Sequence, residues 1–332
     1  MRETKTKISV LPAMLGLSFA ASAQLPPLSL DLSQTTVSGL SSGGYMATQF
    51  HLANSDWISG IGIIGTGPYY CAQGDIRKAL SQCVATANPP IDNALLLEQA
   101  QQYSAAGDIP PLDNISDDRI WILHGLFDQT VNRSAADAVN EQYLTWTAPD
   151  NVEYIDDKPF GHHFPTLSNG SSCSASESPY IAACDYDAAG EMLNHLYSEL
   201  NPPVEADERL FTVDQVALSG DSAMGLAEQG YVFIPKSCES ESCRVHVSFH
   251  GCKQNAEAVG NSYAQMTGIN QWANSNNIVV LYPQTKSSML MPLNPHGCWD
   301  WWGYTGSDYA TKDAVQIQAV VNMVNALNTR TE

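Results

Sequence analysis

The chain has 332 residues, of which 35 are Asp or Glu and 15 are Lys or Arg, so its net charge at pH 7 is −20. So acidic a surface argues against nucleic acid or an anionic membrane as a partner, and it suits an uncharged substrate or a saline medium. The length is sufficient for a large core, in one α/β domain or in two smaller ones.

The N-terminal residues have the pattern of a secretory signal peptide. Residues 1–7 are basic, residues 8–20 are mostly apolar, and Ala21-Ser22-Ala23 is a cleavage site built of small residues. The apolar run is too short to span a membrane. We therefore expect residues 1–23 to be removed and the mature chain, residues 24–332, to be secreted into a periplasm or out of the cell.

Residues 36–47 predict a strand, a sharp turn and a helix. They include G-L-S-S-G at 39–43, the G-x-S-x-G pattern of a nucleophile elbow, which requires this context. Glycine on both sides lets the strand and the helix approach closely while Ser41 adopts a strained conformation. The N–H groups at the start of the helix suit a developing oxyanion. Ser41 is therefore the candidate nucleophile, although so short a pattern also arises by chance.

The elements after the elbow predict an α/β fold. The apolar run at 61–65 is bounded by glycine, which favours a buried strand in a mostly parallel sheet with helices on both faces. No domain linker is evident in the segment that follows it. The further expected elements are helices at 45–54, 75–85, 91–105 and 135–146 and strands at 119–124 and 152–155.

An acid and a base follow two of these strands. Asp128 comes after the strand at 119–124, and His162 and His163 come after the strand at 152–155. Functional groups of α/β proteins gather at the carboxyl ends of the strands, and the order Ser, Asp, His is that of an α/β-hydrolase. Asp128 has the alternative role of capping the next turn. In an extended loop only one of the two neighbouring histidines faces Ser41.

Other histidines compete less well for the role of base. His124 and His250 both lie at strand ends, and His250 is better explained as a hydrogen-bonding residue of its loop. His246 lies inside a predicted strand and is expected to be a buried structural histidine. His51, His195 and His296 give no signal.

The last part of the chain contains a unit that normally precedes the nucleophile in this fold: a strand, a loop beginning His-Gly, a helix and another strand. Ser41 is also too close to the mature N-terminus for the strands that usually come before it. The simplest explanation is a circular permutation that moves the ends of the chain to just before the elbow. The elements are strands at 231–235, 244–249 and 278–282 and helices at 256–273 and 308–327, with the loop His250-Gly251-Cys252 after the second strand.

Eight cysteines in an exported chain predict disulfides. Local spacing favours the pairs Cys71 with Cys83, Cys173 with Cys184, and Cys238 with Cys243, which leaves Cys252 for Cys298, although spacing alone does not fix connectivity. The chain contains no C-x-x-C and no H-E-x-x-H sequence. We therefore expect neither a metal nor a cofactor.

Four segments together carry a resemblance to a known family. They are residues 39–46, the Gly161-His162 pair with Phe164-Pro165-Thr166, the His250-Gly251-Cys252 loop, and the sequence C-W-D-W-W at 298–302. In this order they resemble exported poly(3-hydroxybutyrate) depolymerases of the circularly permuted, single-domain kind. The resemblance covers almost the whole mature chain, but it includes no C-terminal linker or separate substrate-binding domain.

The resemblance implies roles for these residues. Ser41 would attack the ester carbonyl, His162 would move the proton, and Asp128 would orient the imidazolium. The backbone N–H groups of Ser42 and Cys252 would stabilise the oxyanion, and a Cys252–Cys298 disulfide would hold the oxyanion loop against the Trp-rich segment. The family pattern favours His162 over His163, which would then be a wall of the site.

Aromatic residues after Cys298 suit an apolar substrate. One interpretation makes these aromatic residues ordinary core or rim residues. Their density also suits a groove for a polyester with methyl groups; the residues are Trp299, Trp301, Trp302 and Tyr304. Trp302 is the expected main substrate contact, with Trp301 as its alternative.

The sequence thus predicts an exported serine esterase that cleaves poly(3-hydroxybutyrate) or its oligomers and acts as a monomer on a polyester or oligoester. Amorphous polymer and soluble oligomers are the expected substrates, because no separate binding domain is evident. One alternative is a secreted carboxylesterase for acetyl or feruloyl esters on the same scaffold. Another is a polymer-binding protein without catalytic activity.

Overall fold

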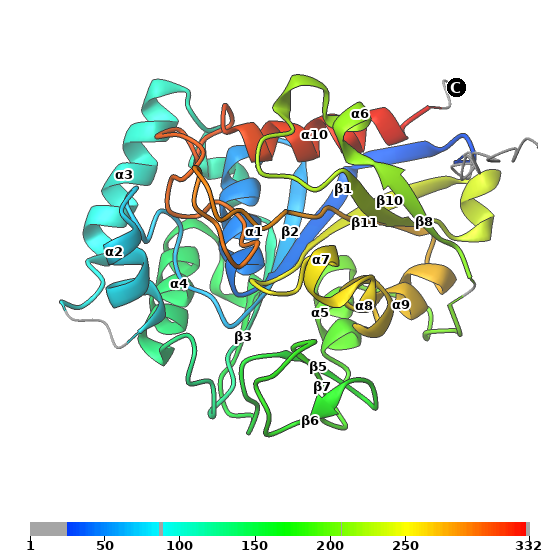
Figure 1. Cartoon of the computed structure of the whole chain (residues 1–332), viewed down its shortest axis with the longest axis horizontal. Helices are drawn as coiled ribbons and strands as arrows, with labels where there is room; N and C mark the ends of the chain where they lie inside the picture. The colour runs from blue at the N-terminus through cyan, green and yellow to red at the C-terminus, as the bar shows by residue number, and fades with distance from the viewer. Residues whose placement is uncertain (1–24, 86–88, 207, 330–332) are drawn as a thin grey trace, which may run out of the picture.

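The computed structural model describes residues 25–85, 89–206 and 208–329. The predicted signal peptide, residues 1–23, lies outside these ranges. An eight-stranded sheet runs through the molecule (Figure 1). Parallel pairings join its first six strands in the order β4, β3, β2, β1, β10 and β11, and antiparallel pairings add β9 and then β8 at one edge. The strands are β1 (Ser29–Leu40), β2 (Ile58–Ile64), β3 (Arg119–Leu123), β4 (Val152–Ile155), β8 (Leu210–Asp214), β9 (Gln229–Phe233), β10 (Ser242–Phe249) and β11 (Ile278–Tyr282).

Both faces of the sheet are buried, as the continuous apolar strands predict. Along β3, Ile120 and Ile122 belong to one core cluster, whereas Trp121 and Leu123 belong to another. Because successive side chains of a strand point to opposite faces, the two clusters lie on the two sides of the sheet. In Figure 1, α10 lies above the sheet, and α5, α8 and α9 lie below it. The first cluster includes residues of α1 (Ser42–Ala53), α3 (Asn93–Ala106), α4 (Arg133–Trp146) and α10 (Val315–Leu327), and the second those of α5 (Ala188–Tyr197), α8 (Ser262–Met266) and α9 (Ile269–Ser275).

The strand order agrees with a circular permutation. The elbow strand β1 pairs with β2 on one side and with β10, from the second half of the chain, on the other. Their register matches Gly39 with Phe249, so Ser41 and Gly251 both come two residues beyond the same paired position. The permuted connection therefore brings the His-Gly loop beside the elbow.

The two helices predicted in the last part of the chain differ from the structure. The helix expected at 256–273 is divided into α7 (Ala256–Val259), α8 and α9, because two glycines with positive φ interrupt it: Gly260 (φ 62°), the C-cap of α7, and Gly268 (φ 88°), the N-cap of α9. The helix expected from residue 308 begins only at Val315. Before it, Thr311 donates both its N–H and its hydroxyl to the carbonyl of Asp308, which makes a local turn instead of a helix.

A small sheet and several short helical segments were not predicted from the sequence. The short strands β5, β6 and β7 are below the length at which apolar alternation is visible. The helix predicted at 75–85 is a short α-helix, α2 (Ile76–Lys78), followed by a π-helical turn, η1 (Ala79–Val84). The segments that were not predicted are β5 (Phe164–Thr166), β6 (Ser171–Ser172), β7 (Ile181–Ala183), η2 (Leu112–Ile115), η3 (Pro149–Asn151), α6 (Gln215–Ser219), η4 (Gly220–Ser222) and η5 (Lys236–Glu239).

All eight cysteines form disulfides, with the pairing that local spacing favoured. Within the described ranges, no helix has both the length and the apolarity that crossing a membrane requires. The bonds join Cys71 to Cys83, Cys173 to Cys184, Cys238 to Cys243, and Cys252 to Cys298.

Candidate active site

The elbow has the close contacts that its glycines predict. A Cβ at Gly39 would lie 2.1 Å from the carbonyl oxygen of Gly43, and a Cβ at Gly43 would lie 2.2 Å from that of Phe249. Ser41 is the N-cap of α1 and has φ 57° and ψ −122°, a strained conformation for a residue other than glycine. Its N–H donates to the carbonyl of Ile64 at 2.9 Å, which ties the turn to β2. The serine thus stands at the end of the central strand on a rigid support.

Asp128 and His162 form a buried pair. The Nδ1 atom of His162 lies 2.7 Å from Oδ2 of Asp128, and the two side chains are 6% and 1% exposed. The other carboxylate oxygen accepts the N–H groups of Thr130 and Val131. Burial raises the pKa of Asp128, but the hydrogen bond and charge of His162 and the N–H of Val131 outweigh it and lower the pKa overall. An ionised Asp128 keeps the proton of neutral His162 on Nδ1, which leaves Nε2 able to accept one.

The backbone of His162 is also held. Its N–H donates to the hydroxyl of Ser176 at 2.8 Å. Ser176 lies in the loop between β6 and β7, and the Cys173–Cys184 disulfide closes this loop. Ser41 and His162 line the same cleft, and no hydrogen bond joins them among the described contacts. Such bonds are often long until substrate is bound.

His163 is not a wall of the site, contrary to the expectation from the sequence. It is 1% exposed, and the described lining of the cleft does not include it. Its Nδ1 donates to the carbonyl of Ala175, and its Nε2 lies 3.4 Å from Sγ of Cys184. Burial lowers the pKa of His163. The ring therefore packs beneath the loop that holds His162.

His124 directly follows β3, and it also lies outside the described lining of the cleft. Burial lowers the pKa of its imidazole. Of the histidines considered as bases, His162 is the one hydrogen-bonded to a carboxylate at the cleft.

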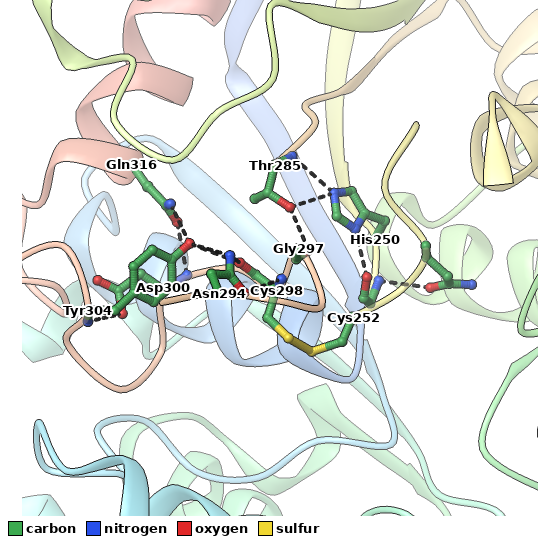
Figure 2. Close-up of a disulfide and its surroundings, with 11 residues drawn as sticks. His250, Cys252, Thr285, Asn294, Gly297, Cys298, Asp300, Tyr304 and Gln316 are labelled. Atoms are coloured by element: carbon green, nitrogen blue, oxygen red, sulfur yellow. Dashed lines mark hydrogen bonds between the residues drawn. A yellow bond between two sulfur atoms is a disulfide. The ribbon is translucent and has the colours of Figure 1, made fainter. Parts of the chain in front are cut away.

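Figure 2 shows how the loop after β10 is fixed. His250 lies with Nδ1 2.7 Å from the carbonyl oxygen of Gly251, and its Nε2 accepts the N–H of Thr285 at 3.2 Å. These partners require a neutral ring with its proton on Nδ1. Burial agrees with this, because it lowers the pKa of His250 to about 4.

The hydrogen bond from His250 fixes the Gly251 carbonyl and thereby the direction of the Cys252 N–H. Because a trans peptide is planar, the N–H of Cys252 points away from the carbonyl that His250 holds. No acceptor for this N–H occurs among the described contacts. Gly251 lies close to the elbow, since a Cβ added to it would be 3.4 Å from Cβ of Ser41. Ser42 begins α1, so its N–H lacks an intrahelical acceptor as well.

Gln254 connects this loop to the segment that carries His162. Its Oε1 accepts the N–H of Gly251 at 2.8 Å, and its Nε2 donates to the carbonyls of Pro179 and Tyr180 at 2.8 and 3.1 Å. The side chain is fully buried. One amide thus sets the spacing between the loop that begins at His250 and the β5–β7 region.

The Cys252–Cys298 disulfide joins the loop after β10 to the Trp-rich segment (Figure 2). The side chain of Asn294 holds the Cys298 end of this disulfide, because it accepts the N–H of Cys298 and donates to the Cys298 carbonyl. Thr285, which bonds His250, also donates its hydroxyl to the carbonyl of Gly297. The disulfide therefore lies within one hydrogen-bonded network.

Asp300 shapes the tryptophan loop. Its Oδ1 accepts N–H groups of Gly303 and Tyr304 at 2.7 and 2.9 Å, and its Oδ2 accepts the N–H and the hydroxyl of Thr305. Burial raises the pKa of this carboxyl, although these bonds act in the opposite direction. The loop therefore turns around a single buried side chain.

The tryptophans differ in environment. Trp301 is 5% exposed and stacks on Tyr45 with a centroid distance of 4.2 Å, whereas Trp302 is only partly buried. Both line the cleft. Trp299 is fully buried against Phe249 and belongs to the core. Trp302 thus offers more surface to a bound molecule than Trp301 does.

The cleft itself has a volume of about 840 Å³. Ser41, His162, Gly251 and Cys252 lie in its wall, together with a largely apolar surface. Apolar lining residues include Ile76, Leu80, Val84, Met291, Leu293 and Trp302.

Three residues of this site were not singled out from the sequence: Ser176, Gln254 and Asp300. Ser176 and Gln254 act through partners distant in the chain, which a local pattern does not reveal. For Asp300 a signal existed, because an aspartate followed closely by Gly303 and Thr305 is typical of a side-chain-supported turn.

Among the described residues, one group of metal-ligand side chains is compact: His163, Cys173 and Cys184. The two cysteines form a disulfide, so they offer no thiolate to a metal. This group does not fit a metal site.

Comparison with known proteins gives consistent similarities. The family model described as Esterase PHB depolymerase matches residues 230–331. The chain is 36% identical to a poly(3-hydroxybutyrate) depolymerase of Delftia acidovorans over 95% of its length, which spans 63% of that relative. It is 35% identical to a polyhydroxybutyrate depolymerase of Talaromyces funiculosus, over 97% of each chain.

Two solved structures are also similar. One is a serine-to-alanine variant of a PHB depolymerase complexed with an R3HB trimer, with a TM-score of 0.85 and 32% identity. The other is the PHB depolymerase from Penicillium funiculosum, with a TM-score of 0.84 and 31% identity. Each comparison covers 92% of this chain and 98% of the other.

Proposed function

The chain belongs to the poly(3-hydroxybutyrate) depolymerase family, and from that premise we propose that it is an exported serine esterase that hydrolyses poly(3-hydroxybutyrate) or its oligomers. The products are hydroxybutyrate monomers and short oligomers. The strongest support for this proposal is the set of groups that the cleft brings together. The cleft holds an elbow serine, a histidine bonded to a buried carboxylate, and a backbone N–H that has no acceptor among the described residues.

In the proposed reaction Ser41 attacks the ester carbonyl while Nε2 of His162 takes its proton. Asp128 stabilises the imidazolium, which then protonates the departing alcohol. The N–H groups of Ser42 and Cys252 stabilise the tetrahedral oxyanion, and loss of one such donor typically raises the barrier by about 3 kcal/mol. Water then hydrolyses the acyl-enzyme by the same proton path. The carboxylate bond and the orientation of the Cys252 peptide support these roles.

The apolar character of the cleft and its surroundings supports a polyester substrate. Met289, Leu290 and Met291 are 76%, 80% and 89% exposed, and Met291 lines the cleft. Exposed apolar residues in one segment at the mouth of a cleft suit contact with another apolar surface. A methyl-substituted polyester chain has this chemistry, and Trp302 is the proposed main contact within the cleft.

The proposed setting is extracellular or periplasmic, with the protein acting as a monomer. Four disulfides suit an oxidising compartment. The pattern of residues 1–23 supports export.

The test is hydrolysis of an amorphous poly(3-hydroxybutyrate) suspension by the purified mature chain. We expect the suspension to clear and hydroxybutyrate monomers and short oligomers to appear in the supernatant. The Ser41→Ala variant should lose at least about a thousandfold in kcat while keeping its unfolding midpoint. Labelling by a fluorophosphonate should follow the same pattern.

Release of acetate or ferulate from plant polysaccharide, with no clearing of the polymer, would instead support a carboxylesterase on this scaffold. Absence of labelling and of all ester hydrolysis would leave a polymer-binding protein. Retained turnover in pure Ser41→Ala protein would remove Ser41 from the mechanism.

A further inference from the structure

One side chain in the described lining of the cleft carries a fixed charge, and it is Lys253. The lining contains no Asp, Glu or Arg among the described residues, and its other members are apolar, polar or histidine. The ammonium of Lys253 has neither an ion pair nor a hydrogen bond within the described ranges. Lys253 is exposed, and in a chain with 35 acidic and 15 basic residues it is the cation that the described lining presents to an anion in the cleft.

The backbone holds Lys253 in a fixed and unfavourable conformation. Its φ is 59°, in the left-handed region that lysine rarely adopts. Its N–H donates to the carbonyl of His296 at 2.7 Å. On one side Cys252 is bonded to Cys298, and on the other Gln254 is buried with three hydrogen bonds. Strain of this kind persists only where the surroundings impose it, and it is common at binding sites.

The substrate chemistry supplies an anion at this place. When an oligoester of a hydroxy acid is cleaved, the departing alcohol fragment ends in a carboxylate, and hydrolysis of the acyl-enzyme produces a second one. The net charge of −20 disfavours the approach of such anions to the molecule. A lysine beside the oxyanion donor Cys252 offsets this locally, and its flexible four-carbon stem lets the ammonium meet a carboxylate at the mouth of the cleft.

We propose that Lys253 binds the terminal carboxylate of a hydroxybutyrate oligomer and thereby directs cleavage toward ester bonds near the carboxyl end. This inference rests on the proposed esterase function and adds the part of the substrate that the cleft recognises. An exposed ion pair of this type contributes up to about 1 kcal/mol, which corresponds to about fivefold in kcat/KM. Lys253 is then a determinant of substrate preference and takes no part in the bond-breaking step.

The kinetic experiment compares two substrates that differ in the charge of the terminal carboxyl group and follows cleavage of the ester bonds between hydroxybutyrate units, which both share. The 3-hydroxybutyrate trimer as its free acid and the same trimer as its methyl ester are hydrolysed by the natural protein and by Lys253→Gln. We expect the ratio of kcat/KM for the acid to that for the methyl ester to fall by about fivefold in Lys253→Gln. Lys253→Arg should restore most of the ratio, and Lys253→Glu should lower it further.

The matched control is Lys286→Gln, which removes the same charge from an exposed lysine outside the described lining. It should leave the ratio at its natural value. High salt should also reduce the preference of the natural protein, because at 1 M ionic strength the screening length is only about 3 Å. An unchanged ratio in Lys253→Gln, or an equal fall in Lys286→Gln, would overturn the proposal.

A binding measurement tests the carboxylate site independently of the esterase function. In a Ser41→Ala background, calorimetric titration with the free-acid trimer should give a Kd about fivefold higher when Lys253 is replaced by Gln. The methyl ester should give the same Kd with and without Lys253. If the natural protein hydrolysed neither trimer but this difference in Kd appeared, the esterase function would fail and the carboxylate site would stand. Equal Kd values for the acid would remove the site even in an active esterase.

Discussion

Gln254 illustrates how single residues act at a distance in this protein. Its amide oxygen accepts a hydrogen bond from the N–H of Gly251, and its amide nitrogen donates to the carbonyls of Pro179 and Tyr180. The Gln254 side chain is fully buried, and an unpaired polar group in the interior costs about 1–3 kcal/mol. Gln254 therefore couples the oxyanion loop to the region that supports His162, and its loss should affect catalysis as well as stability.

The variant Gln254→Met keeps the size of the side chain and removes every hydrogen bond. We expect kcat to fall by about tenfold or more, because the Cys252 N–H is no longer held where the oxyanion forms. KM should change less. Steady-state kinetics and the rate of inactivation by a fluorophosphonate measure this, and both rates should fall by the same factor.

Gln142→Met is the matched control for this prediction. Gln142 is also a fully buried amide, and it bonds the N–H and the carbonyl of Tyr69 away from the described lining of the cleft. Its loss should lower the unfolding midpoint while kcat stays near its natural value. Equal falls of kcat in the two variants would show that Gln254 has a structural role alone.

At the scale of elements, the site depends on two neighbouring parallel strands, β1 and β10. Strand β1 ends in the elbow, strand β10 ends in the oxyanion loop, and their register brings Ser41 and Gly251 together. The Cys252–Cys298 disulfide then fixes the second loop to the Trp-rich segment. The Cys238–Cys243 disulfide lies at the start of β10, away from the elbow.

Removal of the two disulfides should have different consequences. The double variant Cys252→Ala with Cys298→Ala keeps the backbone N–H of residue 252 but frees its loop, so we expect kcat/KM for the trimer to fall by about tenfold. The double variant Cys238→Ala with Cys243→Ala should lose stability and retain its kcat/KM. Kinetics together with thermal unfolding distinguish the two, and an unaffected kcat/KM in the first variant would contradict the prediction.

At the scale of the whole molecule, two fully buried histidines make stability depend on pH. His246 lies on β10, and its ring nitrogens bond the hydroxyls of Thr36 and Ser38 on the neighbouring strand β1 at 2.7 and 2.8 Å. Burial lowers the pKa of His246 to about 3 and that of His250 to about 4. Both are neutral in the folded protein, whereas an unfolded histidine has a pKa of about 6.5.

The sign of the effect follows from proton binding. Between pH 6.5 and 4 the unfolded chain binds protons that the folded protein excludes, so the free energy of unfolding falls as the pH falls. Each histidine contributes about 1 kcal/mol per pH unit in this interval. Asp300 opposes the trend, because burial raises its pKa, whereas His124 and His163 add to it.

We therefore expect the free energy of unfolding in urea to be several kcal/mol lower at pH 4.5 than at pH 7. The number of protons taken up on unfolding at pH 5 should be close to two or above. A potentiometric measurement of that uptake is the direct check. Equal stability at the two pH values would show that neither histidine is buried in its neutral form.

The sequence by itself determined the features that depend on neighbours along the chain. The elbow follows from two glycines around Ser41, the strands from runs of apolar residues, and the positions of Asp128 and His162 from the rule that parallel strands end at one edge of a sheet. Local spacing favoured the disulfide pairs that the structure contains, and the order of motifs indicated a permuted sheet. Each of these patterns is local or rests on a general property of the fold.

Only the tertiary structure decided the contacts between distant segments. It turned His162 toward Asp128 and His163 toward Cys184, divided the helix after residue 256, and brought Ser176 and Gln254 to the site. The orientation of the Cys252 N–H likewise depends on His250 and Thr285, which come from different loops. Such contacts are set by the packing of both faces of the sheet, and no pattern of adjacent residues specifies them.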